Sequence, residues 1–449
     1  MSKSQIVFNA IAEQTYHIAV DGFSGAQGAI DLNINAVQPP VNDNFADSTR
    51  LAGSSLSVEG TNEFATGEPG EPDHAAFQFG GNFGNPANFN SSWWTWRAPA
   101  SGEVTIDTIG SGFDTTLGIY TGLAVNSLTE IVSNDDSPGL GLRSEVTFNA
   151  VAGQTYHIAV DGWSNRQGSI DLNLDLDLEY TQVGTNAGEQ LNGTSANDVI
   201  QSRGGDDQIN GNGGHDYLEG NGGNDTIAGG SLSDFIDGGE GNDQLFGNGG
   251  GDEIFGGSGN DGLYGSSAAD YLNGGSGDDS IYGNGGEDTL IGGGGSDTIY
   301  GGSQADEILG GNDADLIYGN GGEDTLIGGG GSDTIYGGSQ ADEILGGNGA
   351  DLIYANGGND LINGGNGIDE IWLGGGETVV LDANDTGYDI IRNFQLGQTT
   401  FVVNDINALS FADGTNGAEI SQGGNLLATV SWQSASTFAN NISDIFFTA

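Results

Sequence analysis

The stretch Gly238-Gly239-Glu240-Gly241-Asn242-Asp243-Gln244-Leu245 shows one unit of a pattern that recurs every nine residues between 190 and 372. In each unit an aspartate follows a run of small residues, and an isoleucine or leucine stands two positions after it. A fixed short period of this kind predicts a solenoid. The aspartate recurs twenty times without a failure, at Asp198, Asp207, Asp216, Asp225, Asp234, Asp243, Asp252, Asp261, Asp270, Asp279, Asp288, Asp297, Asp306, Asp315, Asp324, Asp333, Asp342, Asp351, Asp360 and Asp369.

The nonapeptide predicts a minimal strand followed by a turn. The residue in the middle of the strand is the isoleucine or leucine, which points inward, and the glycines and asparagines of the turn tolerate positive φ. Two units form one coil of 18 residues, so twenty units predict a parallel β-roll of ten coils, roughly 48 Å long. Its core is a thin double column of isoleucine and leucine.

The aspartates of successive coils stack on each flank of this roll. Like charges at a strand spacing of about 4.8 Å cost roughly 3.5 kcal/mol per pair at an effective dielectric of 20. A cation between the turns reverses the sign, and hard oxygen ligands in wide turns favour Ca²⁺ over Zn²⁺, Cu²⁺ or Mg²⁺. The alternative is that the aspartates only form turns. Asn, Ser and Gly form such turns as well, so a position that only needed a turn former would vary among these residues, whereas all twenty positions are aspartate. We therefore predict all twenty aspartates as Ca²⁺ ligands.

This nonapeptide resembles the RTX (haemolysin-type) calcium-binding repeat, which forms a parallel β-helix. Ten turns on each flank leave nine gaps, which sets an upper limit of about 18 Ca²⁺ ions in the roll. The resemblance implies a secreted, extracellular protein, either free or associated with a cell surface, that leaves the cell by type I secretion. Low cytosolic calcium would keep the roll unfolded until export.

Composition excludes several classes of function. The 449 residues include 63 Asp and Glu against 7 Lys and Arg, a net charge of −56, which repels nucleic acid and anionic membranes. The absence of cysteine excludes disulfides and thiolate chemistry. No apolar run approaches the length of a transmembrane segment, and residues 1–12 lack the pattern of a secretory signal peptide. The expected partners are calcium ions and an extracellular glycan or matrix protein.

Upstream of the repeats, short alternating runs such as Val104-Thr105-Ile106-Asp107 predict an all-β sandwich. Residues 8–33 match residues 148–173 at a constant offset, so we interpret 1–37 as a truncated copy of the sandwich and 38–180 as a complete one. The chain would then be a piece of, or descend from, a longer tandem protein.

The complete copy resembles the bacterial pre-peptidase C-terminal (PPC) domain family, which implies a jelly-roll-like accessory module of secreted proteins. The resemblance rests on Asn42-Asp43-Asn44-Phe45-Ala46, Trp94-Thr95-Trp96-Arg97-Ala98-Pro99-Ala100-Ser101-Gly102, Phe113-Asp114-Thr115-Thr116-Leu117-Gly118-Ile119-Tyr120, Ser133-Asn134-Asp135-Asp136 and Tyr156-His157-Ile158-Ala159-Val160-Asp161-Gly162.

The β-roll is expected over 181–372, and residues 373–449 leave the period. A solenoid needs a cap against end-to-end pairing, so a β-rich cap is predicted for 373–449. The run Gly387-Tyr388-Asp389-Ile390-Ile391-Arg392-Asn393-Phe394 is similar to C-terminal flanks of RTX proteins. That similarity implies that the C-terminus also carries the type I secretion signal.

No catalytic motif is recognised. His-Glu-x-x-His and Gly-x-Ser-x-Gly are both absent. His17 and His157 occupy the same position of the duplicated block, and His74 has no recognisable partner. We predict a secreted, non-enzymatic calcium-binding protein used in adhesion or in surface or matrix assembly. The alternative is the accessory C-terminal half of a larger secreted hydrolase of the peptidase type, with its catalytic domain upstream.

Two finer features concern the surface of the roll. An aromatic residue recurs every 18 residues from Phe246 to Trp372 and predicts an outward ladder of stacked rings, which either stabilises the coil or binds a glycan or protein. The residue two before the aspartate is usually glycine, and its replacement should distort alternate sites on the flank Asp198–Asp360 but not on the flank Asp207–Asp369. The replacements are Ala196, Leu232, Ala268, Gln304 and Gln340, with Asp313 on the other flank.

Overall fold

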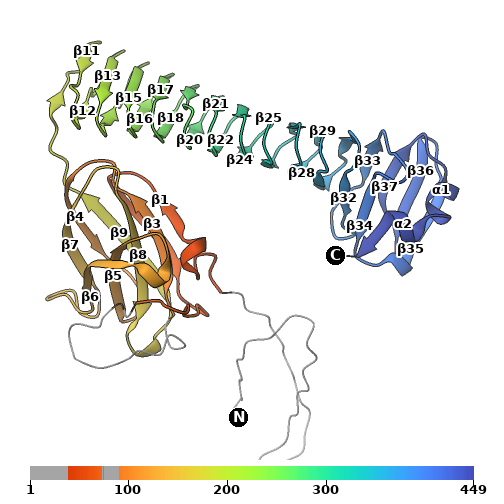
Figure 1. The fold of residues 1–449 in the computed structure, drawn as a ribbon, viewed down its shortest axis with the longest axis horizontal. Helices are drawn as coiled ribbons and strands as arrows, with labels where there is room; N and C mark the ends of the chain where they lie inside the picture. The colour runs from red at the N-terminus through yellow and green to blue at the C-terminus, as the bar shows by residue number, and fades with distance from the viewer. Residues whose placement is uncertain (1–38, 73, 75–89, 449) are drawn as a thin grey trace, which may run out of the picture.

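The computed structural model describes residues 39–72, 74 and 90–448, and this part of the chain is almost entirely β-structure. A β-sandwich lies beside the first turns of a long parallel β-solenoid, and the C-terminal residues close its far end (Figure 1). The all-β fold with a β-roll is confirmed. The truncated copy predicted at 1–37 lies outside the described residues, and the limits of the domains stay predictions.

Two sheets enclose the hydrophobic core of the sandwich, which includes Trp94, Trp96 and Ile158. Alternating burial along β7 (Glu145–Ala150) reflects the alternating sequence pattern that predicted these strands. The five-stranded sheet has the order β1 (Thr49–Leu51), β3 (Ser92–Arg97), β8 (Thr155–Gly162), β5 (Thr115–Thr121) and β6 (Thr129–Asn134). The four-stranded sheet has the order β2 (Ser55–Thr61), β9 (Ser169–Leu176), β4 (Gly102–Asp107) and β7 (Glu145–Ala150). Short 3₁₀ turns are η2 (Phe45–Asp47), η4 (Val125–Ser127) and η5 (Trp163–Asn165).

The roll consists of two long sheets whose strands alternate along the chain. The first, of 14 strands, has the order β10 (Gln182–Val183), β12 (Val199–Gln201), β14 (Tyr217–Glu219), β16 (Phe235–Glu240), β18 (Glu253–Ser258), β20 (Tyr271–Ser276), β22 (Thr289–Gly294), β24 (Glu307–Asn312), β26 (Thr325–Gly330), β28 (Glu343–Gly349), β30 (Leu361–Gly367), β32 (Thr378–Leu381), β34 (Thr400–Val403) and β38 (Phe446–Thr448).

The second sheet, of 15 strands, has the order β11 (Gln190–Asn192), β13 (Gln208–Gly213), β15 (Thr226–Ser231), β17 (Gln244–Asn248), β19 (Gly262–Tyr264), β21 (Ser280–Asn284), β23 (Thr298–Gly302), β25 (Leu316–Asn320), β27 (Thr334–Gly338), β29 (Leu352–Asn356), β31 (Glu370–Trp372), β33 (Asp389–Arg392), β37 (Asn425–Ser431), β36 (Gly417–Gln422) and β35 (Leu409–Asp413).

Strands one coil apart pair in parallel, as Ile254 with Leu272 and Ile317 with Ile335. The predicted coil of 18 residues is therefore confirmed. The isoleucine or leucine of every unit is buried in one continuous core, with an exposed fraction of 2% or less from Ile200 to Ile371. Each unit thus contributes a single aliphatic side chain to the interior of the roll.

Both sheets continue beyond Trp372, and the segment predicted as a cap first extends the roll. The coil length changes there, since Asn363 pairs with Val380 and Trp372 pairs with Arg392. The antiparallel strands β35, β36 and β37, with η6 (Ile406–Ala408), α1 (Ala435–Ala439) and α2 (Ile442–Ile445), then close the end. Phe401, Phe438 and Phe446 pack in its interior.

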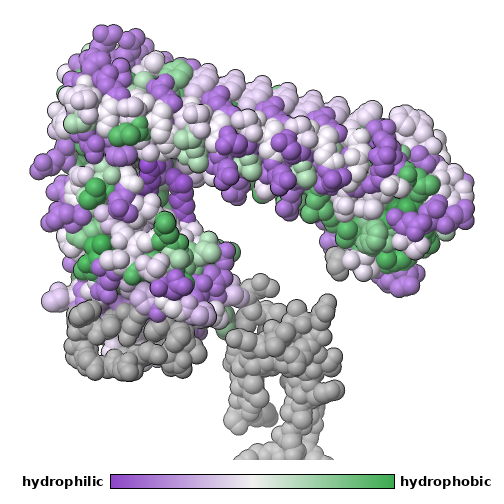
Figure 2. Space-filling model, viewed as in Figure 1, coloured by the Kyte–Doolittle hydropathy of each residue, from purple (hydrophilic) through white to green (hydrophobic). Residues whose placement is uncertain are grey.

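The sandwich packs on the 14-stranded sheet at the beginning of the roll. Val199, Tyr217 and Phe235 belong to the hydrophobic core of the sandwich although their strands are part of the roll. Arg50 forms an ion pair with Glu253 at 2.7 Å and lies over the ring of Tyr271. On the face shown in Figure 2, the most hydrophobic surface lies on the sandwich and the C-terminal cap, whereas the roll between them is mainly polar or neutral.

Candidate metal sites of the roll

Each repeated aspartate stands immediately before a strand and links two coils. Except in Asp198 and Asp207, the first aspartate of each flank, its Oδ1 accepts a hydrogen bond from the backbone N–H of the aspartate one coil earlier, as Asp279 does from Asp261 at 2.8 Å. Eighteen such bonds of 2.7–3.0 Å connect the twenty aspartates. The aspartates are therefore more than local turn formers, because one carboxylate oxygen of each ties its turn to the next.

The second oxygen of these carboxylates has no such partner. All twenty aspartates are buried, and Oδ2 accepts no hydrogen bond in eighteen of them, the exceptions being Asp198 and Asp270. A buried polar atom without a partner costs about 1–3 kcal/mol, and more when the group is charged. A column of such atoms indicates a ligand, because buried charges in proteins are normally paired or bind a metal.

In eighteen of the twenty units the residue five before the aspartate is glycine, which leaves space beside Oδ2, and Ser202 and Ala355 are the exceptions. A Cβ atom placed on Gly310 would lie 2.6 Å from Oδ2 of Asp315 and 2.6 Å from the carbonyl oxygen of Gly328 in the next coil. Gly283 has the same relation to Asp288 and Gly301. Carboxylate and carbonyl oxygens therefore border one small space between turns. This donor set consists of hard oxygens and fits Ca²⁺.

The metal-free carboxylates resist ionisation. The pKa of Asp234 is raised to about 8, with burial as the largest cause; the hydrogen bond from the N–H of Asp216 opposes the shift, and the charges of Asp252 and Asp216 contribute to it. The pKa of Asp279 is raised to about 7 by the same causes, with burial again the largest. A divalent cation beside these oxygens would offset the effect of burial and of the neighbouring carboxylates, since opposite charge lowers a carboxyl pKa.

Asp198 and Asp270 differ from the other aspartates. The backbone N–H of Thr194 and that of Ser266 donate to Oδ2 of Asp198 and Asp270, each at 2.6 Å, and the Thr194 hydroxyl adds a bond of 3.0 Å. Both aspartates lie on the flank Asp198–Asp360. On the flank Asp207–Asp369, by contrast, all ten Oδ2 atoms lack a partner. The two flanks therefore differ, although calcium occupancy itself stays a prediction.

On the flank Asp198–Asp360, four of the five replaced glycines lack a positive φ, whereas distortion of the metal sites themselves stays a prediction. The backbone does not have a positive φ at Ala196, Ala268, Gln304 or Gln340. Leu232 keeps a φ of 73° and leaves its side chain 54% exposed, so the expected change of turn shape is wrong at this position. Asp313 on the other flank also keeps a positive φ, of 70°.

Three further carboxylates occupy positions equivalent to those of the repeated aspartates, and none of the three was predicted from the sequence. Glu189 donates its N–H to Oδ1 of Asp207, and it stands one full coil earlier. Glu377 precedes β32 as Asp360 precedes β30, is fully buried and has an Oε2 without a partner. Asp389 begins β33, and burial, then the charge of Asp369, raises its pKa well above the usual value. Glu189 was visible from the 18-residue spacing, whereas the changed coil length concealed the other two.

The aromatic ladder is confirmed. Seven of its rings, from Phe246 to Tyr354, stack with centroids 4.8–5.0 Å apart and interplanar angles of at most 10°. Trp372 extends the stack at 6.2 Å. The rings are partly exposed along the 15-stranded sheet, on the side opposite the sandwich.

His74, for which the sequence offered no partner, lies in a buried polar cluster. Its Nδ1 lies 2.9 Å from the Tyr120 hydroxyl, and its Nε2 lies 3.0 Å from Glu71 Oε1 and 3.1 Å from Ser91 Oγ. A serine-hydrolase triad requires the serine and the acid on opposite ring nitrogens. Here both lie at Nε2, so the cluster does not have triad geometry.

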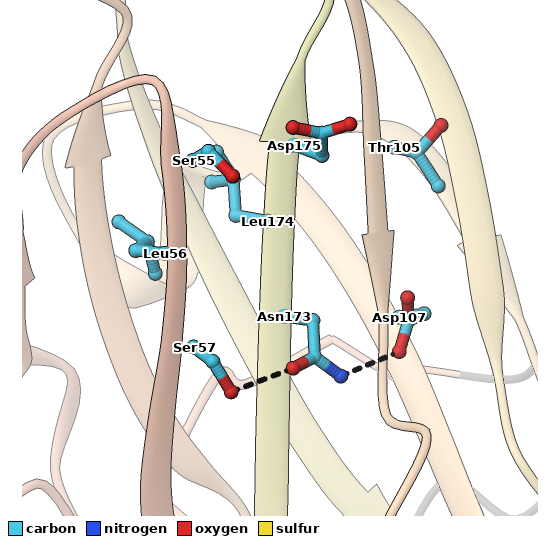
Figure 3. A pocket seen from close by; sticks show the side chains of 8 residues that line it. All are labelled: Ser55, Leu56, Ser57, Thr105, Asp107, Asn173, Leu174 and Asp175. Atoms are coloured by element: carbon cyan, nitrogen blue, oxygen red, sulfur yellow. Dashed lines mark hydrogen bonds between the residues drawn. The ribbon is translucent and has the colours of Figure 1, made fainter.

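An open polar depression of about 570 Å³ lies on the outer face of the four-stranded sheet (Figure 3). Asn173 bridges its neighbours there, accepting from Ser57 Oγ and donating to Asp107 Oδ1, each at 2.7 Å. Asp107 also accepts from the N–H of Ile109. These bonds serve the sheet itself, and the non-enzymatic function stays a prediction.

Comparison with known proteins supports the interpretation of the repeats. A search of curated proteins finds no match to this chain. A solved structure, described as the catalytic unit of thermostable GH87 alpha-1,3-glucanase from Streptomyces thermodiastaticus strain HF3-3, aligns over 79% of this chain and 96% of its own at 12% identity. Its TM-score of 0.19 is too low to show a shared fold. The model of the RTX calcium-binding nonapeptide repeat matches six stretches between residues 183 and 371. This part of the chain therefore consists of RTX calcium-binding repeats in a parallel β-solenoid.

Proposed function

We propose that this protein is a secreted, non-enzymatic calcium-binding protein whose roll folds when Ca²⁺ binds between stacked turns. The observation that carries the proposal is the column of buried Oδ2 atoms without hydrogen-bond partners. The repeated aspartates and the carbonyl oxygens beside the turn glycines would hold the ions. Calcium would neutralise the aspartate carboxylates between coils, and the isoleucine and leucine columns could then pack without opposing charge repulsion.

A matched pair of variants tests the ligand role. Asp279→Asn keeps an oxygen for the N–H of Asp261 but removes a charge beside two gaps, so the chain should bind one or two fewer Ca²⁺ ions. The control Asp278→Asn changes the exposed neighbouring residue, whose Oδ1 accepts a hydrogen bond from the N–H of Ser296. Asparagine can accept the same bond, as Oδ1 of Asn260 does from the N–H of Asp278. This control should bind as many ions as the unaltered chain. Equal calcium counts for both variants in equilibrium dialysis would contradict the ligand assignment.

Export by a type I system is supported by the similarity of 387–394 to C-terminal flanks of RTX proteins. None of the helices among the described residues is long and apolar enough to cross a membrane. Ile445 and Phe446 are buried in the cap, so deletion of the C-terminus would also damage its fold. A gain-of-function test avoids this problem. Residues 373–449 fused to a cytosolic reporter should carry it into the medium only when a type I exporter is present.

Adhesion or surface assembly is the proposed use of the folded protein. The stacked, partly exposed tyrosines offer ring faces of the kind that bind glycans, and the sandwich, which resembles PPC domains, would act as an accessory module. A screen of glycans and matrix proteins with and without calcium tests this role. Binding should require calcium, because only the folded roll presents the ladder. Replacement of Tyr300 and Tyr318 by leucine should weaken it without changing the calcium count.

A further inference from the structure

The sandwich contains an acidic cluster that the calcium-binding roll does not explain. Asp114 stands immediately before β5, and Asp135 and Asp136 stand immediately after β6. These strands pair in antiparallel fashion, with Leu117 opposite Asn134. The start of β5 and the end of β6 therefore lie side by side, and the three aspartates meet at this end of the two strands. One carboxylate oxygen from each lies within 4.8 Å of the others.

The surrounding hydrogen bonds hold the two segments together. Ser144 Oγ contacts the carbonyl oxygen of Thr115 at 2.6 Å and that of Asp135 at 2.5 Å. The guanidinium of Arg143 donates to the carbonyl oxygen of Phe113 at 2.6 Å. These bonds fix the backbone on both sides of the cluster, and the carboxylates are thereby brought together by the fold. Such a preformed arrangement of oxygens is what a cation site requires.

Asp135 supplies an independent sign of a missing ligand. Its side chain is only 4% exposed, and its buried Oδ1 has no hydrogen-bond partner. Burial, followed by the charges of Asp136 and Asp114, raises the pKa of Asp135 to about 6. Among the residues that the structure describes, Arg166 forms a weak ion pair with this cluster, because its Nε lies 3.9 Å from Asp114 Oδ2 and the Arg166 side chain is 58% exposed.

We propose that Asp114, Asp135 and Asp136 form a calcium site in the sandwich, separate from the sites of the roll. The three donors are hard carboxylate oxygens, a set that suits Ca²⁺ and disfavours softer metals. The ion would join the end of β6 to the start of β5. It would therefore stabilise this edge of the sandwich whether or not the roll is folded.

Long-wavelength diffraction from crystals of the full chain grown with Ca²⁺ gives the direct test. An anomalous peak between the three carboxylates is expected, with the peaks of the roll as an internal reference. Peaks in the roll with none at this cluster would overturn the proposal, whereas a peak here with none in the roll would instead contradict the proposed function of the repeats.

A solution measurement uses the nearly isosteric Asp135→Asn, with Asp175→Asn, an exposed carboxylate of the same domain, as its control. Calcium should raise the unfolding temperature of the sandwich in the unaltered chain and in Asp175→Asn, and raise it less in Asp135→Asn. The near-ultraviolet circular dichroism of the sandwich tryptophans reports this transition. An equal calcium-induced shift in all three chains would overturn the proposal.

Discussion

The sandwich and the roll bury hydrophobic side chains equally completely, but they differ in what lies beside them. In the sandwich, Trp93, Trp94 and Trp96 are at most 2% exposed and pack among other apolar side chains and rings. In the roll, each nonapeptide buries one isoleucine or leucine together with one aspartate. The sandwich core is mainly apolar, with a polar cluster around His74 at one side, whereas the core of the roll is flanked by columns of charge.

Magnitudes show why this difference matters. Burying an aliphatic side chain contributes about 1.5–3 kcal/mol, and leaving a carboxylate oxygen buried without a partner costs about 1–3 kcal/mol or more. In each nonapeptide of the metal-free roll these terms are of similar size. The sandwich should fold without an ion, and the roll should need one.

Calcium removal should separate the two regions most clearly. At neutral pH, far-ultraviolet circular dichroism of the calcium-free chain should show a largely disordered roll, while the near-ultraviolet signal of the sandwich tryptophans persists. Calcium at about 10⁻⁴–10⁻³ M, the range of extracellular modules, should restore the β-signal cooperatively, because each coil stabilises its neighbours. A native β-spectrum without calcium would show that the roll core suffices.

Acidification should partly replace calcium. The folded-state pKa of Asp234 is raised to about 8 and that of Asp279 to about 7, above the ordinary value of 3.8. Groups with raised pKa stabilise the folded state at low pH and lose that contribution as pH rises through the folded pKa. The calcium-free chain should therefore show more β-structure at pH 5.5 than at pH 8. No change between pH 5.5 and 8 would contradict this prediction.

Truncating one core side chain in each region should lower the free energy of unfolding of that region by about 2–5 kcal/mol. Trp96→Ala should destabilise the sandwich with and without calcium, because its hydrophobic core packs whether or not the ion is bound. Ile317→Ala should lower only the calcium-dependent transition of the roll. Thermal unfolding followed by near- and far-ultraviolet circular dichroism separates the two. A calcium-free transition that moves in Ile317→Ala would show that the roll is folded without the ion.

Restoring glycine in one altered turn should add calcium to the roll. In Ser266→Gly/Ala268→Gly the turn regains glycine at the two positions that have positive φ in most other units, so the N–H of residue 266, which donates to Oδ2 of Asp270, can turn away from that oxygen. The chain should bind at least one more Ca²⁺ ion in equilibrium dialysis. Ser267→Gly, at the exposed position between them, is the control and should not change the count. An unchanged count in the double variant would mean that this turn already binds calcium.

The smallest effect is expected from the aromatic ladder. Tyr318 stacks on Tyr300 and Tyr336 at 4.8 Å, and such contacts contribute about 0.5–1.5 kcal/mol per pair beyond area burial. Tyr318→Ala should lower the roll transition by a few degrees in calcium and leave the sandwich unchanged. A loss of calcium ions in this variant would show that the ladder also shapes the turns.

The sequence by itself determined the repeating part of this protein. A nine-residue period fixes the strand, the turn and the inward residue of each unit, and the coil repeats that local solution. The twenty aspartate positions, the two aliphatic columns and the aromatic ladder could therefore be predicted residue by residue. Glu189 obeys the same spacing and was available to the same reasoning.

Tertiary structure decided what depends on chain segments meeting outside the period. Glu377 and Asp389 continue the carboxylate columns only because coils of altered length keep strand register. The hydrogen bonds from Thr194 and Ser266 depend on the shape of individual turns. Arg50 reaches Glu253 only through the packing of the sandwich on the roll. Asp114 and Asp135 meet because β5 and β6 pair, and composition reveals that acids are present but not which of them the fold brings within reach of one ion.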